Sequence, residues 1–134
     1  MTVLNDLRRA EFSQVAGYFG EGVRVLEFGG GNGWQASLIA GTGASVVSID
    51  VSPVSNDSER HYPVLLYDGR NLPFADESFD VVFSSNVLEH VAHLDDMLVE
   101  LQRVTRPGGL HLHILPTPTW RVATSLTHYV FLAR

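Results

Sequence analysis

The sequence of 134 residues contains no cysteine and no lysine. Without cysteine, disulfides, thiol nucleophiles and thiolate metal sites are excluded, and the redox compartment stays open. No uncharged apolar run reaches the roughly 18 residues of a membrane-spanning helix. The N-terminus also lacks the charged and apolar segments of a signal peptide. We therefore expect a soluble protein of the cytoplasm with no membrane span.

Positive charge is scarce and scattered. All nine basic residues are arginines, the formal net charge is -6, and Arg8–Arg9 is the only adjacent pair. An acidic chain without a basic run is not expected to bind nucleic acid. Hydrophobic residues make up 45% of the chain and charged residues 18%, as in ordinary globular proteins. The length predicts a single domain over residues 1–134.

Apolar spacing and turn residues predict helices that alternate with strands. We expect helices over residues 3–19 and 34–40, a third from 94 to the break at Pro107, and a last one within 117–134. Strands are expected over residues 24–28, 45–50, 64–67, 79–84 and 110–115. This alternation predicts a parallel sheet with helices on both faces.

A glycine-rich turn is the most informative segment. Residues 25–33 read Val-Leu-Glu-Phe-Gly-Gly-Gly-Asn-Gly, and Asp50 ends the next strand. Glycines allow the backbone to approach a ligand closely, and an acid at a strand tip can accept both hydroxyls of a ribose. A dinucleotide fingerprint would place its third glycine at position 34, which is Trp34. The spacing therefore indicates a nucleoside pocket other than a typical NAD site.

Five segments in this order resemble the motifs of class I S-adenosylmethionine-dependent methyltransferases. They are residues 25–33, Asp50, Asp68, residues 79–90 (Phe-Asp-Val-Val-Phe-Ser-Ser-Asn-Val-Leu-Glu-His) and residues 106–109 (Arg-Pro-Gly-Gly). The resemblance covers about residues 20–116 and is closest to the type 11 branch of ubiquinone and menaquinone biosynthesis. It implies a Rossmann-like, doubly wound α/β fold with about five mainly parallel strands in the order 3-2-1-4-5. The core would span residues 20–116, followed by a C-terminal helix over 117–134.

The resemblance also implies S-adenosylmethionine as cofactor and assigns residues to it. Gly29, Gly31 and Gly33 would line its methionine part, Glu27 would lie near its ammonium group, and Asp50 would hold the ribose hydroxyls.

Further residues follow by the same resemblance. Asp68, with the backbone of Gly69, would meet the adenine amino group, although a plain Asp-Gly turn is the alternative. Ser84 and Ser85 would lie under the methionine part and the reacting methyl group.

Methyl transfer from a sulfonium needs little from a protein beyond positioning. Glu89 and His90 follow the fourth strand and are the candidates for a base or a contact to the acceptor, since imidazole titrates near neutrality. The alternative is that His90 begins or caps a helix and Glu89 is solvated. Some relatives bind a divalent metal here, but this chain offers Asn86 in place of a further carboxylate. We expect no metal.

The chain departs from the family after the fifth strand. The family's sheet has seven strands, whereas the residues after Leu115 read as one helix. The fifth strand would then be an exposed edge, which invites pairing. A homodimer or a partner bound through that edge or through the C-terminal helix is the corresponding expectation.

The function that we expect is transfer of a methyl group from S-adenosylmethionine to a small-molecule acceptor. The first alternative is a catalytically silent or partner-dependent module that binds the cofactor. The second, less favoured, is an NAD(P)-dependent oxidoreductase.

Overall fold

The computed structural model describes residues 3–52 and 59–118. Five strands form one sheet in the order β3-β2-β1-β4-β5, and every neighbouring pair is parallel. The strands are β1 (Arg24–Phe28), β2 (Ser45–Asp50), β3 (Val64–Leu66), β4 (Phe79–Ser85) and β5 (Thr105–Ile114). The predicted fold class and strand order are confirmed.

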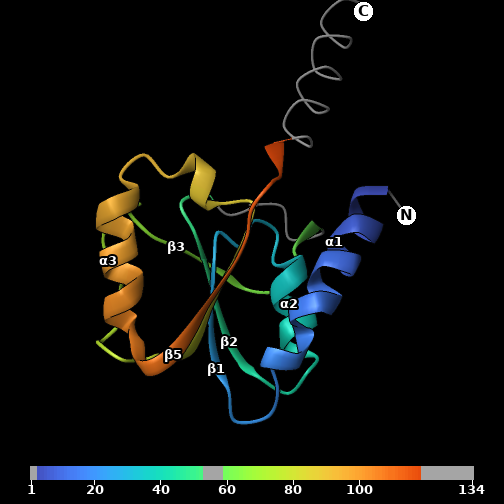
Figure 1. Ribbon diagram of the computed structural model, residues 1–134, viewed down its shortest axis with the longest axis horizontal. Coiled ribbons are helices and arrows are strands. Elements are labelled where there is room, and N and C mark those ends of the chain that lie inside the picture. The colour runs from blue at the N-terminus through green and yellow to red at the C-terminus, as the bar shows by residue number, and fades with distance from the viewer. Residues whose placement is uncertain (1–2, 53–58, 119–134) are drawn as a thin grey trace, which may run out of the picture.

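Helices cover both faces of the sheet. The α3 helix (Leu94–Val104) lies on one face, and α1 (Val3–Val15) and α2 (Trp34–Ala40) lie on the other (Figure 1). Short 3-10 helices follow α1 at Ala16–Tyr18 and β4 at Leu88–His90. The predicted C-terminal helix falls mostly on residues 119–134, which lie outside the described part of the chain.

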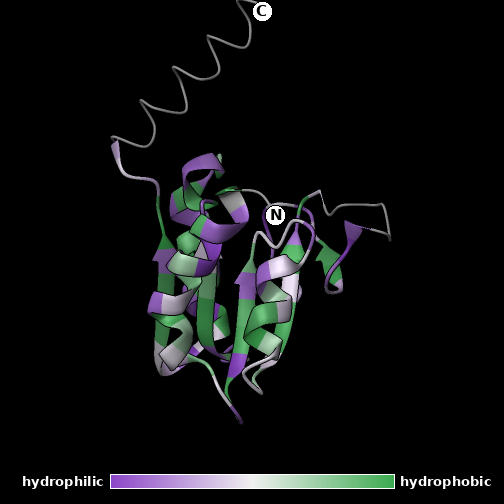
Figure 2. Ribbon diagram, turned by 90° about the vertical axis from the view of Figure 1, so that its right-hand side faces the viewer, coloured by the Kyte–Doolittle hydropathy of each residue, from purple (hydrophilic) through white to green (hydrophobic). Residues whose placement is uncertain are grey.

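Successive strand side chains point into two apolar layers, one on each face of the sheet, and among the described residues the strands supply half of the buried hydrophobic side chains of these layers. The strands are coloured mainly as hydrophobic in Figure 2. On the α3 face, Leu26 and Phe28 join the buried stripe of α3, which is Met97, Leu101 and Val104. On the other face, Val25 packs with residues of α2, β4 and the segment after α1, which are Ala36, Ile39, Val81, Phe83 and Phe19. Period-two side chains on buried parallel strands produce this double layer.

The start of β5 differs from the prediction. We expected the third helix to continue to residue 106 and the strand to begin at 110, but β5 begins at Thr105. Thr105 pairs with Phe79, and the next pairs join Val81 to Leu110, so residues 106–109 are accommodated in a register shift. A proline without an N–H group is tolerated at such an irregularity on an edge strand. The proline therefore marks a bulge in the strand rather than the end of the helix.

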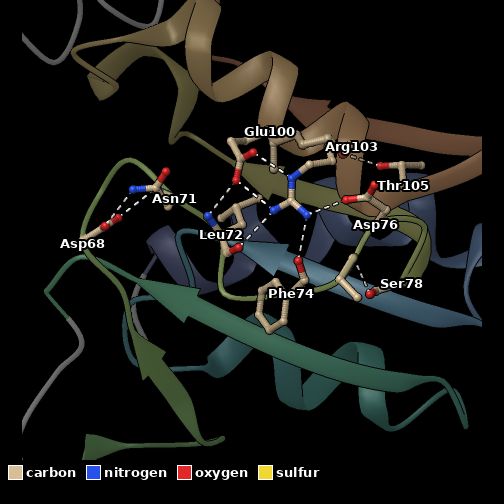
Figure 3. Close-up of polar contacts among 11 residues, drawn as sticks. Asp68, Asn71, Leu72, Phe74, Asp76, Ser78, Glu100, Arg103 and Thr105 are labelled. Atoms are coloured by element: carbon tan, nitrogen blue, oxygen red, sulfur yellow. Dashed lines mark hydrogen bonds and ion pairs between the residues drawn. The ribbon is translucent and has the colours of Figure 1, made fainter.

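Arg103 on α3 fixes the loop that leads into β4 (Figure 3). Its guanidinium donates hydrogen bonds to Glu100 Oε1 at 2.7 Å, to Asp76 Oδ1 at 2.9 Å, and to the carbonyls of Phe74 at 2.8 Å and Leu72 at 3.0 Å. Hydrogen bonds to charged groups are stronger than neutral ones. This cluster holds the loop after β3 against α3, and so helps to place the segment that begins at Asp68.

The outer edge of β5 has no paired strand within the described residues, and Leu110 and Leu115 along it are 43% and 55% exposed. The partner contact expected at this edge stays a prediction. Among the described residues, no helix combines the length and apolar character that crossing a bilayer requires.

Candidate cofactor site at the carboxyl ends of the strands

A cavity of about 400 Å³ opens where the strands end. Most of its lining comes from β1, β2 and β4 and the segments that follow them, with one side chain from α1: Arg8, Phe28, Gly29, Asp50, Val51, Tyr67, Gly69, Ser85, Asn86, Val87, His90 and Val91. In the order β3-β2-β1-β4-β5, the chain reverses its direction of progress between β1 and β4. Ligands of doubly wound sheets bind at this switch point.

The glycine turn between β1 and α2 adopts a backbone that side chains would strain. Gly29, Gly31 and Gly33 have φ of 82°, 57° and 77°. A Cβ at Gly29 would collide with Val87, and one at Gly33 with the backbone of Tyr62, whereas the space beside Gly31 is open. Gly29 lines the cavity. The other two glycines shape the turn without lining the cavity.

Asp50 ties the glycine turn to the end of β2. Its Oδ2 accepts the Gly31 N–H at 2.9 Å and its Oδ1 accepts the Ser52 N–H at 2.9 Å. A carboxylate has about four lone-pair sites, so these two bonds leave acceptor capacity on both oxygens. Asp50 also lines the cavity, as a ribose ligand must.

Glu27 lies behind the turn and does not line the cavity. It is 2% exposed, and the Ser48 hydroxyl donates to its Oε2 at 2.6 Å. Burial raises the pKa of Glu27 to about 7; the charge of Asp50 adds to this, while hydrogen bonds from Ser48 and the Ala36 backbone oppose it. A Cβ on Gly30 would overlap the Ser48 hydroxyl. Gly30 thus leaves room for the buried Ser48–Glu27 pair.

Asp68 and Gly69 take different roles in the loop after β3. The Asp68 carboxylate accepts the N–H groups of Arg70 at 2.8 Å and Asn71 at 2.7 Å, and the Asn71 amide at 3.0 Å (Figure 3). These bonds, those of Asn71 first, lower the pKa of Asp68 to about 2. Gly69, with φ of 82°, lines the cavity. The contact of the Asp68 carboxylate with adenine stays a prediction.

The two serines at the end of β4 point to different places. Ser84 is fully buried, and its hydroxyl lies 2.7 Å from His113 Nδ1 on β5. Ser85 and the next residue, Asn86, line the cavity. Asn86 has a positive φ of 55°, which asparagine tolerates better than most residues.

Of the pair Glu89–His90, only the histidine lines the cavity. His90 ends the short 3-10 helix, its side chain is 79% exposed, and its Nε2 lies 3.7 Å from Glu89 Oε1. The part of the chain that the structure describes holds no group of three or more side chains suited to a metal ion.

Sequence reasoning assigned no role in the site to three polar lining residues, Arg8, Tyr67 and Asn86. Tyr67 stacks edge-on against Phe28 with ring centroids 6.0 Å apart. Burial raises the pKa of Tyr67 to about 12, and the charges of Asp50 and Asp68 contribute. The adjacent Arg8–Arg9 pair was the only sequence signal for Arg8, and it did not place that side chain.

The methyltransferase domain family matches residues 26–113. This chain belongs to that family. The match includes the glycine turn, Asp50, and β4 with the residues that follow it, which together form most of the cavity.

Relatives agree with the family. The chain is 41% identical over 114 residues to a demethylmenaquinone methyltransferase of Mycobacterium sp. (strain KMS), covering 80% of this chain and 48% of that protein. It is 37% identical over 120 residues to an uncharacterized methyltransferase of Mycolicibacterium vanbaalenii, covering 81% of this chain and 46% of that protein. The chain therefore spans about half the length of these relatives.

Among solved structures, the fold resembles a SAM-dependent methyltransferase from Aquifex aeolicus. The TM-score is 0.56 at 24% identity, over 66% of this chain and 54% of that one. The predicted cofactor, S-adenosylmethionine, is the one that this methyltransferase family uses.

The residues present fit an adenosyl ligand. Gly29 brings backbone to the cavity wall, and Asp50 keeps free acceptor positions at the cavity. The volume of about 400 Å³ lies within the usual range of roughly 300–1,000 Å³ for small-molecule sites.

Proposed function

We propose that this chain binds S-adenosylmethionine in the cavity and takes part in methyl transfer to a small-molecule acceptor. The observation that carries the proposal is the Asp50 carboxylate, which faces the cavity while it holds the Gly31 N–H. That arrangement supports binding of a ribose by this carboxylate, next to a turn that admits a ligand against the backbone. The relative named demethylmenaquinone methyltransferase supports an acceptor of small-molecule size.

Each lining group has a part in this proposal. Asp50 accepts the ribose hydroxyls, Gly69 and Tyr67 border the adenine, and the backbone at Gly29 borders the methionine part. When bound, the cofactor supplies a methyl group already activated by a sulfonium. The chain's task is then to orient the acceptor and exclude water, which can contribute several kcal/mol to catalysis, up to roughly 7–11 in favourable systems.

His90 is the proposed proton acceptor for substrates that must lose a proton. It is the lining imidazole, and general base catalysis contributes roughly 10²–10⁴-fold to rate. Glu89, near His90 but off the cavity, would orient the ring. His90→Gln should lower turnover of such an acceptor by at least about tenfold while the affinity for S-adenosylhomocysteine changes little.

Calorimetric titration tests the proposal directly. The wild-type chain should bind S-adenosylmethionine and S-adenosylhomocysteine but not NAD. Asp50→Ala should weaken S-adenosylhomocysteine binding by about 100-fold or more, because each charge-assisted hydrogen bond is worth about 1.5–3 kcal/mol. Asp80→Asn, which alters a carboxylate at the opposite end of the sheet, is the matched control and should leave the affinity unchanged.

Three results would change the conclusion. Binding of NAD alone would support an oxidoreductase instead. Binding of S-adenosylmethionine without turnover over a broad panel of acceptors would support a silent or partner-dependent module. Equal affinity of Asp50→Ala and wild type would remove the ribose assignment.

A further inference from the structure

Arg8 lies on α1 and faces the cavity. The side chain is half-buried and lines the cavity, yet within residues 3–52 and 59–118 it has no hydrogen bond or ion pair. By contrast, Arg24 and Arg106 bind Asp80, and Arg103 binds Glu100. A partly desolvated cation that faces a cavity is best satisfied by an anionic group of the ligand.

The neighbouring residue places Arg8 at the glycine-turn end of the cavity. The Arg9 guanidinium lies 5.3 Å from the centroid of the Trp34 ring, and Trp34 begins α2 directly after Gly33. This cation–π contact holds α1 against the turn. Since α1 lies against this turn, Arg8 approaches the cavity from the side of the glycine turn, where the backbone at Gly29 borders the methionine part in the proposed function.

The charges of the lining residues favour a carboxylate of the ligand as the partner of Arg8. Among the described lining residues, Asp50 is the only carboxylate and Arg8 is the only group with a permanent positive charge. S-adenosylmethionine carries one carboxylate, on its methionine part, and a buried carboxylate needs a charged partner. The planar guanidinium matches a carboxylate with two parallel N–H donors.

We propose that Arg8 binds the carboxylate of the methionine part of S-adenosylmethionine and makes the cavity selective for adenosyl compounds that carry this group. The proposal rests on the proposed function, because it needs the cofactor in this cavity. It adds a positioning residue from the N-terminal helix, outside the matched family segment at residues 26–113.

The affinities of two ligands for two proteins, wild type and Arg8→Gln, isolate the contact between Arg8 and the carboxylate. Decarboxylated S-adenosylmethionine keeps the sulfonium and the amine and lacks only the carboxylate. Wild type should bind it about 10- to 100-fold more weakly than S-adenosylmethionine, the range expected for a charge-assisted hydrogen bond. In Arg8→Gln the affinities for the two ligands should differ by less than about threefold, because the carboxylate has lost its partner. Calorimetry measures all four affinities without turnover.

Two further variants keep the result interpretable. Arg24→Gln removes the same charge at the amino end of the sheet, where Arg24 binds Asp80, and should keep the discrimination between the two ligands. Arg8→Lys should keep part of it, and it covers the case in which Arg8→Gln fails to fold, as judged by thermal unfolding.

Distinct results overturn the inference and the proposed function. Equal affinity of wild type for the two ligands would overturn the role of Arg8 while leaving the cofactor site intact. An Arg8→Gln variant that still binds decarboxylated S-adenosylmethionine more weakly than S-adenosylmethionine would also overturn the role of Arg8. An anionic acceptor would then be the remaining ligand for Arg8. Failure of wild type to bind S-adenosylmethionine at all would contradict the proposed function itself.

Discussion

Asp80 at the amino end of the sheet and Glu27 at the carboxyl end have pKa values that are shifted in opposite directions. At the amino end, Asp80 accepts the Arg24 N–H at 2.7 Å and guanidinium groups of Arg24 and Arg106 at 3.0 and 2.7 Å, and these bonds, those of Arg24 first, lower its pKa to about 2. At the carboxyl end, burial raises the pKa of Glu27 to about 7, and Asp50 keeps acceptor positions free. Polar groups that satisfy one another stabilise the fold, and those left incompletely satisfied are available to a ligand at some cost in stability.

The largest expected effect on stability comes from Glu27→Gln. A neutral amide of the same shape removes the cost of burying a charge, and the Ser48 hydroxyl can accept as well as donate. At pH 8 the free energy of unfolding should rise by up to about 3 kcal/mol, the equivalent of the shift in pKa from 4.5 to about 7. Urea unfolding measures it.

The contribution of Glu27 to the free energy of unfolding should depend on pH. Because the native state holds its Glu27 proton to a higher pH than the unfolded chain, the stability contributed by the protonated group is full below about pH 4.5. It is lost as pH rises to about 7, and Glu27→Gln should flatten this part of the profile. A variant less stable than wild type at pH 8 would show that the carboxylate is stabilising where it lies.

An intermediate effect is expected from Gly30→Ala. The added Cβ would overlap the Ser48 hydroxyl and crowd Glu27 Oε2 at 2.9 Å, so the variant should lose about 2 kcal/mol, as overpacked sites do. Ser48→Ala removes the obstructing hydroxyl. In that background Gly30→Ala should cost clearly less, as measured by a double-mutant cycle of unfolding free energies. An equal cost in both backgrounds would place the strain elsewhere.

The smallest effect is expected from Asp80→Asn, which tests the amino end. Its partners Arg24 and Arg106 are 50% and 47% exposed, so solvent screening limits the loss to about 1 kcal/mol at pH 7. The stability from the lowered pKa is present above about pH 3.8 and is lost as pH falls to about 2, where variant and wild type should converge. A loss of cofactor affinity in this variant would break the distinction between the two ends.

The sequence was sufficient for the central elements of the fold. Largely apolar segments that follow glycines define β1 at Arg24–Phe28 and β2 at Ser45–Asp50, and both bounds agree with the prediction. The beginning of β5 was predicted wrongly because Pro107 and two glycines read as a helix stop. In three dimensions that segment is a register shift against β4, and only the partner strand reveals it.

The sequence predicted which strand ends carry the candidate site, but it did not predict which side chains at those ends line the cavity. Gly29, Asp50, Gly69, Ser85 and His90 do line one cavity, as their positions after strands led us to expect.

Side-chain direction explains why two predicted site residues, Glu27 and Ser84, do not line the cavity. Successive residues of a strand point to opposite faces, so Phe28 and Ser85 line the cavity while their neighbours Glu27 and Ser84 are buried against Ser48 and His113. Arg8 depends on how α1 packs against Trp34, a tertiary contact that no local pattern encodes.

Amide NMR during a titration with S-adenosylhomocysteine tests the central claim, that the carboxyl end of this sheet is the ligand site and the amino end is not. Glycine amides report from both ends. The account predicts shifts at Gly29, Gly31 and Gly69, with Gly22, Gly43 and Gly108 at the amino end unmoved. Shifts that cluster at the amino end, or a saturating ligand that leaves Gly29 and Gly69 unchanged, would contradict it.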